Sequence, residues 1–131
     1  MPVQSTIHTE LRLVIGRAWG CVTFAEIAAH QDKLLAEPNF NPDFNQFMDA
    51  TRVTAWQVSI DEAETAARRR FFSPLSKRAF VVPLPPNSPL ARLFEGFFAL
   101  TQEASKIQLF QDVPSALKWL GLEALPRDHN R

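Results

Sequence analysis

Short apolar runs alternate with longer amphipathic segments along nearly the whole chain of 131 residues. The apolar runs, at about 10–19, 46–53, 78–83 and 106–111, have the length of β-strands and are rich in Val, Ile, Leu and Phe. Each amphipathic segment begins at a residue that commonly caps helices, and apolar positions then recur three or four residues apart. The repeated order of strand and helix predicts a mainly parallel sheet joined by helical crossovers.

Four helix starts are predicted from capping residues. Thr23 and Ser59 each precede a Glu by three residues, which is the spacing of a capping box. Ser88 is followed by Pro at the first helical position, where the missing N–H costs nothing. Asp112 begins the last predicted helix, and Gly121 ends it in a left-handed conformation.

The polarity of the strands predicts where the helices lie. In the first strand, Leu11, Leu13 and Ile15 alternate with generally less apolar positions, which is typical of one buried and one partly solvated face. We therefore expect a single α/β domain over residues 1–131, with a mainly parallel four- or five-stranded sheet and about four helices mostly on one face. Residues 1–9 and 126–131 are polar, and we expect them to be flexible.

Composition narrows the classes of function. Apolar residues make up 46% of the chain and charged residues 21%, which is typical of a folded domain. The formal net charge is zero, so no overall field attracts nucleic acid or an anionic membrane. No apolar run is long enough to cross a bilayer, and residues 1–10 lack a signal core, so we expect a cytoplasmic protein.

The polar residues that could take part in catalysis can each be explained by a structural role instead. Asp49 is expected to bond loop amides, because no His or second carboxylate has an obvious place beside it. His8 and His30 are expected in solvent, and Cys21 is expected to be a small buried residue. The spacing of Cys and His does not suit zinc, and no Gly-rich loop suits a phosphate or dinucleotide. We therefore predict no enzyme activity, no metal and no cofactor.

One basic cluster is a candidate site for an acidic or phosphorylated partner. It consists of Arg68, Arg69 and Arg70, followed by Lys77 and Arg78. The alternative is a structural role, because cations near the C-terminus of a helix offset the helix dipole.

Phenylalanine is abundant, with 11 Phe and no Tyr in the chain. The helix predicted after Ser88 has a broad apolar stripe, which is either core or a surface for a partner. The candidate interaction surface consists of five residues: Phe71, Phe72, Phe94, Phe97 and Phe98. Because twofold pairing is the commonest way to bury such a surface, we expect a homodimer.

Three segments support a resemblance to a known family. They are Gly-Cys-Val-Thr-Phe-Ala-Glu at 20–26, Phe-Met-Asp-Ala-Thr-Arg-Val-Thr at 47–54, and Ile-Gln-Leu-Phe-Gln-Asp-Val-Pro-Ser-Ala-Leu-Lys-Trp-Leu-Gly at 107–121. With the order of elements, they resemble the SpoIIAA-like fold, which holds STAS domains (sulfate transporter and anti-sigma-factor antagonist) and small stand-alone bacterial proteins without an assigned activity. The resemblance covers about residues 10–122.

The resemblance implies a non-enzymatic regulatory or protein-interaction module, with a protein or a second copy as partner. Antagonist-type STAS domains carry Asp-Ser after the Asp-containing strand, and that Ser is phosphorylated. Here Gln57-Val58 stands at the matching place, and Ser59 lies one residue later, so Ser59 is the candidate for such a switch. The alternative is a binding module for a small apolar or lipid-like ligand, because the lipid-binding CRAL-TRIO fold has a similar topology.

Overall fold

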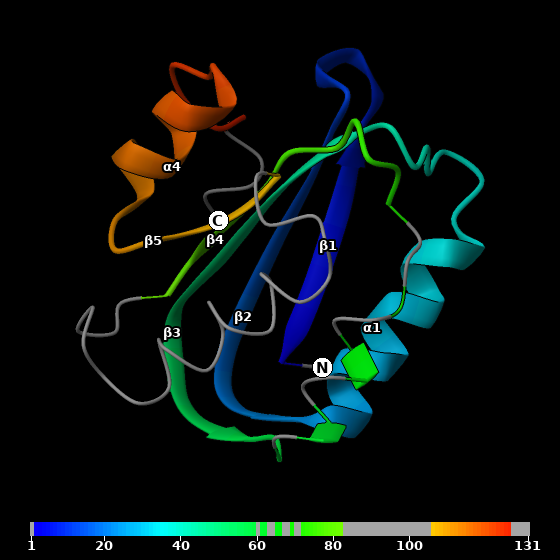
Figure 1. Cartoon of the computed structure of the whole chain (residues 1–131), viewed down its shortest axis with the longest axis vertical. Helices are drawn as coiled ribbons and strands as arrows, with labels where there is room; N and C mark the ends of the chain where they lie inside the picture. Colours follow the sequence, from blue (N-terminus) through cyan, green and yellow to red (C-terminus); the bar gives the residue numbers. More distant parts are fainter. Residues whose placement is uncertain are drawn as a thin grey trace.

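The computed structural model of the chain describes residues 2–59, 61–62, 65–66, 69, 72–82 and 106–126. They contain a five-stranded sheet in which the strands follow the order of the chain (Figure 1). The strands are β1 (Val3–His8), β2 (Leu13–Thr23), β3 (Asn45–Gln57), β4 (Arg78–Val81) and β5 (Ile107–Phe110). The helices that lie wholly within the described residues are the short 3-10 helix η1 (Thr9–Leu11), α1 (Phe24–Ala36) and α4 (Val113–Leu120).

The sheet is mainly parallel, as predicted. β2, β3, β4 and β5 pair in parallel, and β1 pairs with β2 in the antiparallel direction at one edge. The strands predicted at 46–53, 78–83 and 106–111 are confirmed as β3, β4 and β5, and the first predicted strand is β2, which starts later and extends further.

The expectation of a flexible polar lead over residues 1–9 is wrong, because Val3–His8 form the edge strand β1. Gln4 and Thr6 are exposed, whereas Val3 and His8 are buried. Polar side chains suit an edge strand with one solvated face, so their polarity was no evidence against a strand. Arg12, with φ of 51°, lies at the turn that leads the chain back into β2.

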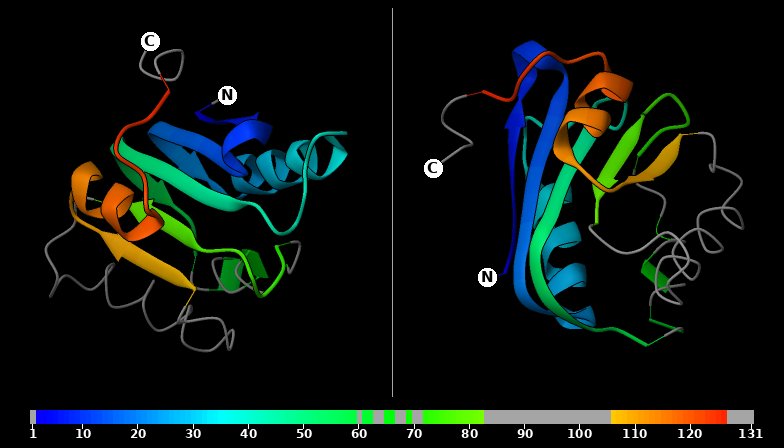
Figure 2. Two further views of the ribbon diagram at one scale, coloured as in Figure 1. Left: turned by 90° about the horizontal axis from the view of Figure 1, so that it is seen from above. Right: turned by 90° about the vertical axis from the view of Figure 1, so that its left-hand side faces the viewer.

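The expectation that the helices lie mostly on one face is also wrong for α1 and α4, which lie on opposite faces of the sheet (Figure 2). Leu13 and Ile15 of β2 belong to an apolar cluster with Leu117 of α4. Val14, between them in the sequence, clusters with Leu34 of α1. Three consecutive buried residues therefore serve two faces, as in sheets that are covered on both sides.

The predicted helix caps are confirmed where the structure describes them. The hydroxyl of Thr23 accepts the Glu26 N–H at 3.4 Å, and the Glu26 carboxylate accepts the Thr23 N–H at 3.3 Å. The carboxylate of Asp112 accepts the Ser115 N–H at 2.8 Å, and Gly121 ends α4 with φ of 77°. These side chains satisfy backbone groups that the helix itself cannot pair.

The second predicted helix start is present as well. Ser59 and Glu62 form the reciprocal pair, with N–H to oxygen bonds of 2.9 and 3.1 Å. The residues at 61, 62, 65 and 66 are helical. The helix predicted from Ser88 lies outside the described residues.

Candidate functional site

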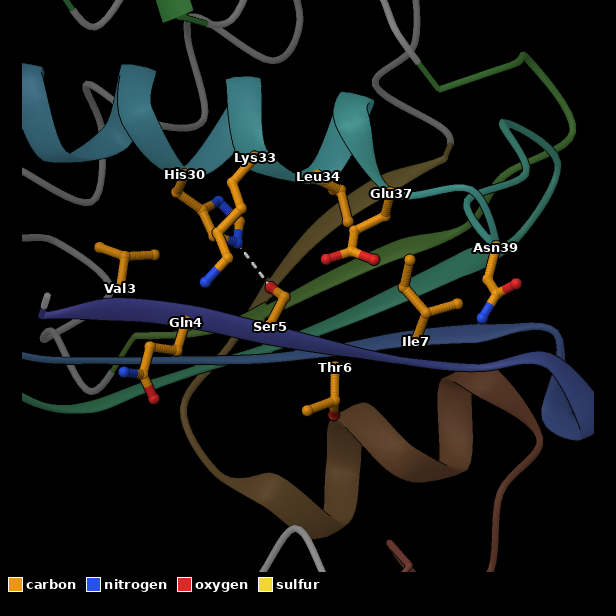
Figure 3. A pocket seen from close by; sticks show the side chains of 10 residues that line it. All are labelled: Val3, Gln4, Ser5, Thr6, Ile7, His30, Lys33, Leu34, Glu37 and Asn39. Atoms are coloured by element: carbon orange, nitrogen blue, oxygen red, sulfur yellow. Dashed lines mark hydrogen bonds between the residues drawn. The ribbon is translucent and has the colours of Figure 1, made fainter.

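A groove of about 400 Å³ lies between β1 and α1 (Figure 3). Five consecutive residues of β1 line it, together with one side of α1 and the loop that follows: Val3, Gln4, Ser5, Thr6, Ile7, His30, Lys33, Leu34, Glu37 and Asn39. Neighbouring residues of a strand point to opposite faces of a sheet. Because all five residues line the groove, it follows the outer edge of β1 as well as one face.

The outer edge of β1 presents a regular set of backbone groups. The N–H of Trp19 donates to the carbonyl of Pro2 at 2.9 Å, which fixes which pairs of the β1–β2 ladder are hydrogen-bonded. The backbone groups turned toward β2 belong to Gln4, Thr6 and His8, and those turned away belong to Val3, Ser5 and Ile7. Among the described strands, β1 pairs with β2 alone. This edge can therefore receive a further strand.

His30 and Ser5 link the two walls of the groove. The Ser5 hydroxyl and His30 Nε2 share a hydrogen bond of 2.5 Å, and His30 is only 7% exposed. Burial, with a smaller contribution from the charge of Lys33, lowers the pKa of His30 from its ordinary 6.5 to about 4. His30 is therefore neutral at physiological pH.

The expected solvent exposure of His30 is wrong for a specific reason. The helical pattern alone placed His30 away from most of the apolar stripe, but β1 covers that side of α1. β1, which the sequence pattern did not predict, is therefore the strand that buries His30.

A Ser–His hydrogen bond is also found in nucleophilic catalysis. An effective general base needs a pKa near the working pH, and a pKa of about 4 makes His30 a weak base at neutral pH. Of the carboxylates in the described residues, none is hydrogen-bonded to His30 to orient it. The arrangement suits a structural link that holds β1 against α1.

Gly16 of β2 leaves space for the side chain of Ser5. Gly16 pairs with Ser5 in the β1–β2 ladder. A Cβ atom at Gly16 would lie 2.7 Å from the Ser5 hydroxyl and 2.5 Å from the methyl group of Met48. The absence of a side chain therefore lets Ser5 and Met48 approach the strand closely.

The polar lining comes from both walls. Lys33 of α1 and Glu37, the residue directly after the helix, are exposed, and Asn39 lies at the same end of the groove as Ile7 (Figure 3). Apolar atoms nevertheless make up the larger part of the lining surface, and they come from Val3, Ile7 and Leu34 and from the aliphatic parts of the polar side chains. A lining of this kind suits a peptide, which has a polar backbone and side chains of mixed character, better than a lipid tail.

Of the five Phe residues in the predicted interaction surface, the structure describes one. Phe72 is 6% exposed and clusters with Phe44 and Leu34, and its ring packs edge-on against Phe40 with centroids 5.4 Å apart. Phe72 is therefore part of the core and does not belong to an exposed patch. Phe71, Phe94, Phe97 and Phe98 lie outside the described residues.

Of the basic cluster, Arg69, Lys77 and Arg78 are described, and Arg68 and Arg70 lie outside the described residues. Lys77 donates to the carbonyl of Trp119 at 2.6 Å, and Arg78 is buried. Arg69 forms an ion pair with Asp32 of α1. The amide of Gln31 donates to the carbonyl of Ala66 at 3.4 Å, next to this ion pair. These contacts connect the segment after Ser59 to α1, so Arg69 has a structural partner.

Three other candidates have defined environments. The carboxylate of Asp49 accepts the Thr51 N–H at 2.9 Å, beside a register shift in the β2–β3 ladder, and so bonds a backbone amide as expected. His8 is buried, with Nε2 at 3.1 Å from the Thr6 hydroxyl, so the expected solvent exposure is wrong. Cys21 is exposed, not buried, and the next residue along β2, Val22, is the buried one.

The described residues contain no cluster of three or more His, Cys, Asp or Glu residues that could hold a metal ion. None of the helices that the structure describes is long and apolar enough to cross a membrane.

The comparisons with known proteins concern the fold. No protein-family model matches the chain, and no curated protein matches it. An uncharacterised protein of the DUF3478 family with a SpoIIAA-like fold, from Shewanella loihica PV-4, is similar in structure, with a TM-score of 0.55 and 16% sequence identity. The similarity covers 90% of this chain and 93% of that chain. The chain therefore has a SpoIIAA-like fold, as predicted, and at this identity the likeness extends to the fold alone.

Proposed function

We propose that the chain is a non-enzymatic protein-interaction module that binds an extended segment of a protein by strand addition between β1 and α1. The observation that supports this function is the outer edge of β1, where the backbone groups of Val3, Ser5 and Ile7 face the groove. Extended segments bind to such edges through main-chain hydrogen bonds, and specificity comes from the alternate side chains.

The two walls supply different parts of the recognition. The edge of β1 offers N–H and C=O groups, which contribute affinity for an extended backbone of almost any sequence. Lys33, Glu37 and Asn39 offer charge and hydrogen bonds, and Leu34 and Ile7 offer apolar contact. The bound segment is therefore expected to place polar side chains toward α1 near Lys33 and Glu37.

The setting proposed for this interaction is the cytoplasm, and the role proposed is regulatory. Cys21 is an exposed free thiol, which persists most readily in a reducing compartment. An apolar-ligand module has less support, because seven of the ten residues that line the groove are polar or charged and the Phe-rich helix lies outside the described residues.

The test uses a library of random peptides displayed on phage and selected on the wild-type protein. Ser5→Pro removes one outward N–H and leaves the ladder to β2 intact, since Ser5 does not bond β2 through its backbone. Ser5→Ala is the matched control, because both variants lose the hydroxyl that bonds His30.

We expect the selected peptides to bind wild type and Ser5→Ala and to lose binding to Ser5→Pro, with circular dichroism confirming that each variant is folded. Equal binding to both variants would refute strand addition at β1. A selection that yields no peptide binder would refute the proposed function as well.

A further inference from the structure

We propose that the strand received by the β1 edge is β1 of a second copy of this chain, which gives a homodimer with a continuous sheet. The proposal rests on the function proposed above and names its partner. The twofold axis passes beside Ser5, and the two β1 strands run antiparallel across it.

The spacing of the outward backbone groups selects this register. Val3, Ser5 and Ile7 are the outward residues, and Ser5 lies midway between the other two. When two copies pair antiparallel around Ser5, Ser5 faces Ser5, and Val3 of each copy faces Ile7 of the other. All three outward residues then pair, whereas a shift by two residues in either direction leaves one of them without a partner within β1.

The side chains are complementary in the same register. Val3 meets Ile7 on the α1 side of the sheet, and Gln4 meets Thr6 on the opposite side, so apolar residues pair with apolar and polar with polar. No charged residue occurs between Val3 and Ile7, so the two paired strands place no like charges opposite each other. Pro2 has its carbonyl turned toward β2, and its missing N–H therefore takes nothing from the outer edge.

The β1 edge lacks the devices that usually keep such edges from pairing. Monomeric proteins place Lys, Pro or a bulge on their edge strands. Residues 3–7 contain no Lys and no Pro, and β1 pairs with β2 over all six residues without a register shift. By contrast, the β2–β3 ladder has two shifts. The edge is thus regular over its full length.

The environment of Ser5 also suits the centre of an interface. The hydroxyl of Ser5 is bonded to His30, and the close approach of Gly16 limits the space around it. A strand held in place before binding loses less conformational entropy when a second strand pairs with it. The zero net charge of the chain gives no overall repulsion between copies.

The test uses charges at positions 4 and 6, where both side chains are exposed, and both variants below lose the Thr6 hydroxyl that bonds His8, so this loss does not distinguish them. In the Gln4→Lys/Thr6→Lys variant, the proposed register places Lys opposite Lys twice. In the Gln4→Lys/Thr6→Glu variant, it places Lys opposite Glu twice. Sedimentation velocity across low to high micromolar concentrations measures association of each variant and of wild type.

We expect wild type to dimerise, the Lys/Lys variant to dimerise about tenfold more weakly, and the Lys/Glu variant to dimerise at least as tightly as wild type. A wild-type chain that stays monomeric at high micromolar concentration would overturn the homodimer. Equal dimerisation of both variants would place the contact elsewhere, and loss in both would refute the register.

The two proposals fail separately. If wild type is monomeric but the selected peptides distinguish Ser5→Pro from Ser5→Ala, the interaction function stands and the second copy is not its partner. If no peptide binder is selected but the charge variants behave as expected, the β1 edge pairs only with β1 of a second copy. The proposal that it binds extended segments of other proteins is then wrong.

Discussion

Lowering the pH should destabilise this protein through His30. The folded state holds His30 neutral, with a pKa of about 4, because the ring is buried and Lys33 is near. In the unfolded chain the pKa returns to about 6.5. Between these two values the unfolded state binds more protons than the folded state, so stability is full above about pH 6.5 and falls as the pH falls toward 4.

The size of the effect follows from the two pKa values. Integration of the difference in proton binding from about pH 7 to about pH 5 gives a loss of about 2 kcal/mol in the free energy of unfolding. Carboxylates with ordinary pKa values titrate mainly below this range, so they contribute little to it. A loss of this size is a substantial part of the stability of a small domain.

The measurement is urea unfolding followed by tryptophan fluorescence at both pH values, since the chain contains 3 Trp. His30→Gln removes the titrating ring and keeps an amide nitrogen near the position of Nε2, so this variant should lose about 2 kcal/mol less than wild type over the same pH change. Ser5→Ala should lower stability by about 1 kcal/mol and keep most of the pH dependence, because burial is its main cause. Identical pH dependence in wild type and His30→Gln would refute the reasoning.

Three further substitutions test the fold around the groove. Gly16→Ala should cost about 1–3 kcal/mol, measured by urea unfolding, because its Cβ would overlap the side chains of Met48 and Ser5; an unchanged midpoint would show that both move freely. Thr23→Ala should cost about 1 kcal/mol in the same assay through loss of the capping box, and a stability equal to wild type would contradict the cap. Ser59→Ala should cost a similar amount, about 1 kcal/mol, and if Ser59→Asp instead changes partner binding at unchanged stability, a phosphoserine switch gains support.

The parts of the fold that local physics decides were predictable from the sequence. A cap needs a suitable side chain three residues before the N–H that it accepts, and Thr23, Ser59 and Asp112 all satisfy this requirement. The parallel order of β2 to β5 follows from the alternation of strands and helices, and it determined the fold class correctly.

The faces of the sheet were harder to predict. Leu13 and Ile15 alone suggest alternation, and the burial of Val14 is visible only once α1 is known to pack behind it. A run of three consecutive apolar residues was the available signal for a strand covered on both sides. The first-strand pattern was instead interpreted from Leu11, which the structure places outside β2 and exposed.

The groove could not be predicted from the sequence because its wall β1 was not predicted. The polarity of the exposed positions of β1 explains both this omission and the proposed use of the strand. An edge strand with exposed Gln4 and Thr6 has too little apolar character to stand out in a sequence. The buried environments of His8 and His30 both depend on this strand, so its omission also placed both residues in solvent. A strand that remained fully apolar at an open edge would aggregate without selectivity, whereas one with polar alternate positions pairs through its backbone in a defined register. The polarity that conceals β1 in the sequence is therefore the property that allows it to serve as a specific interface.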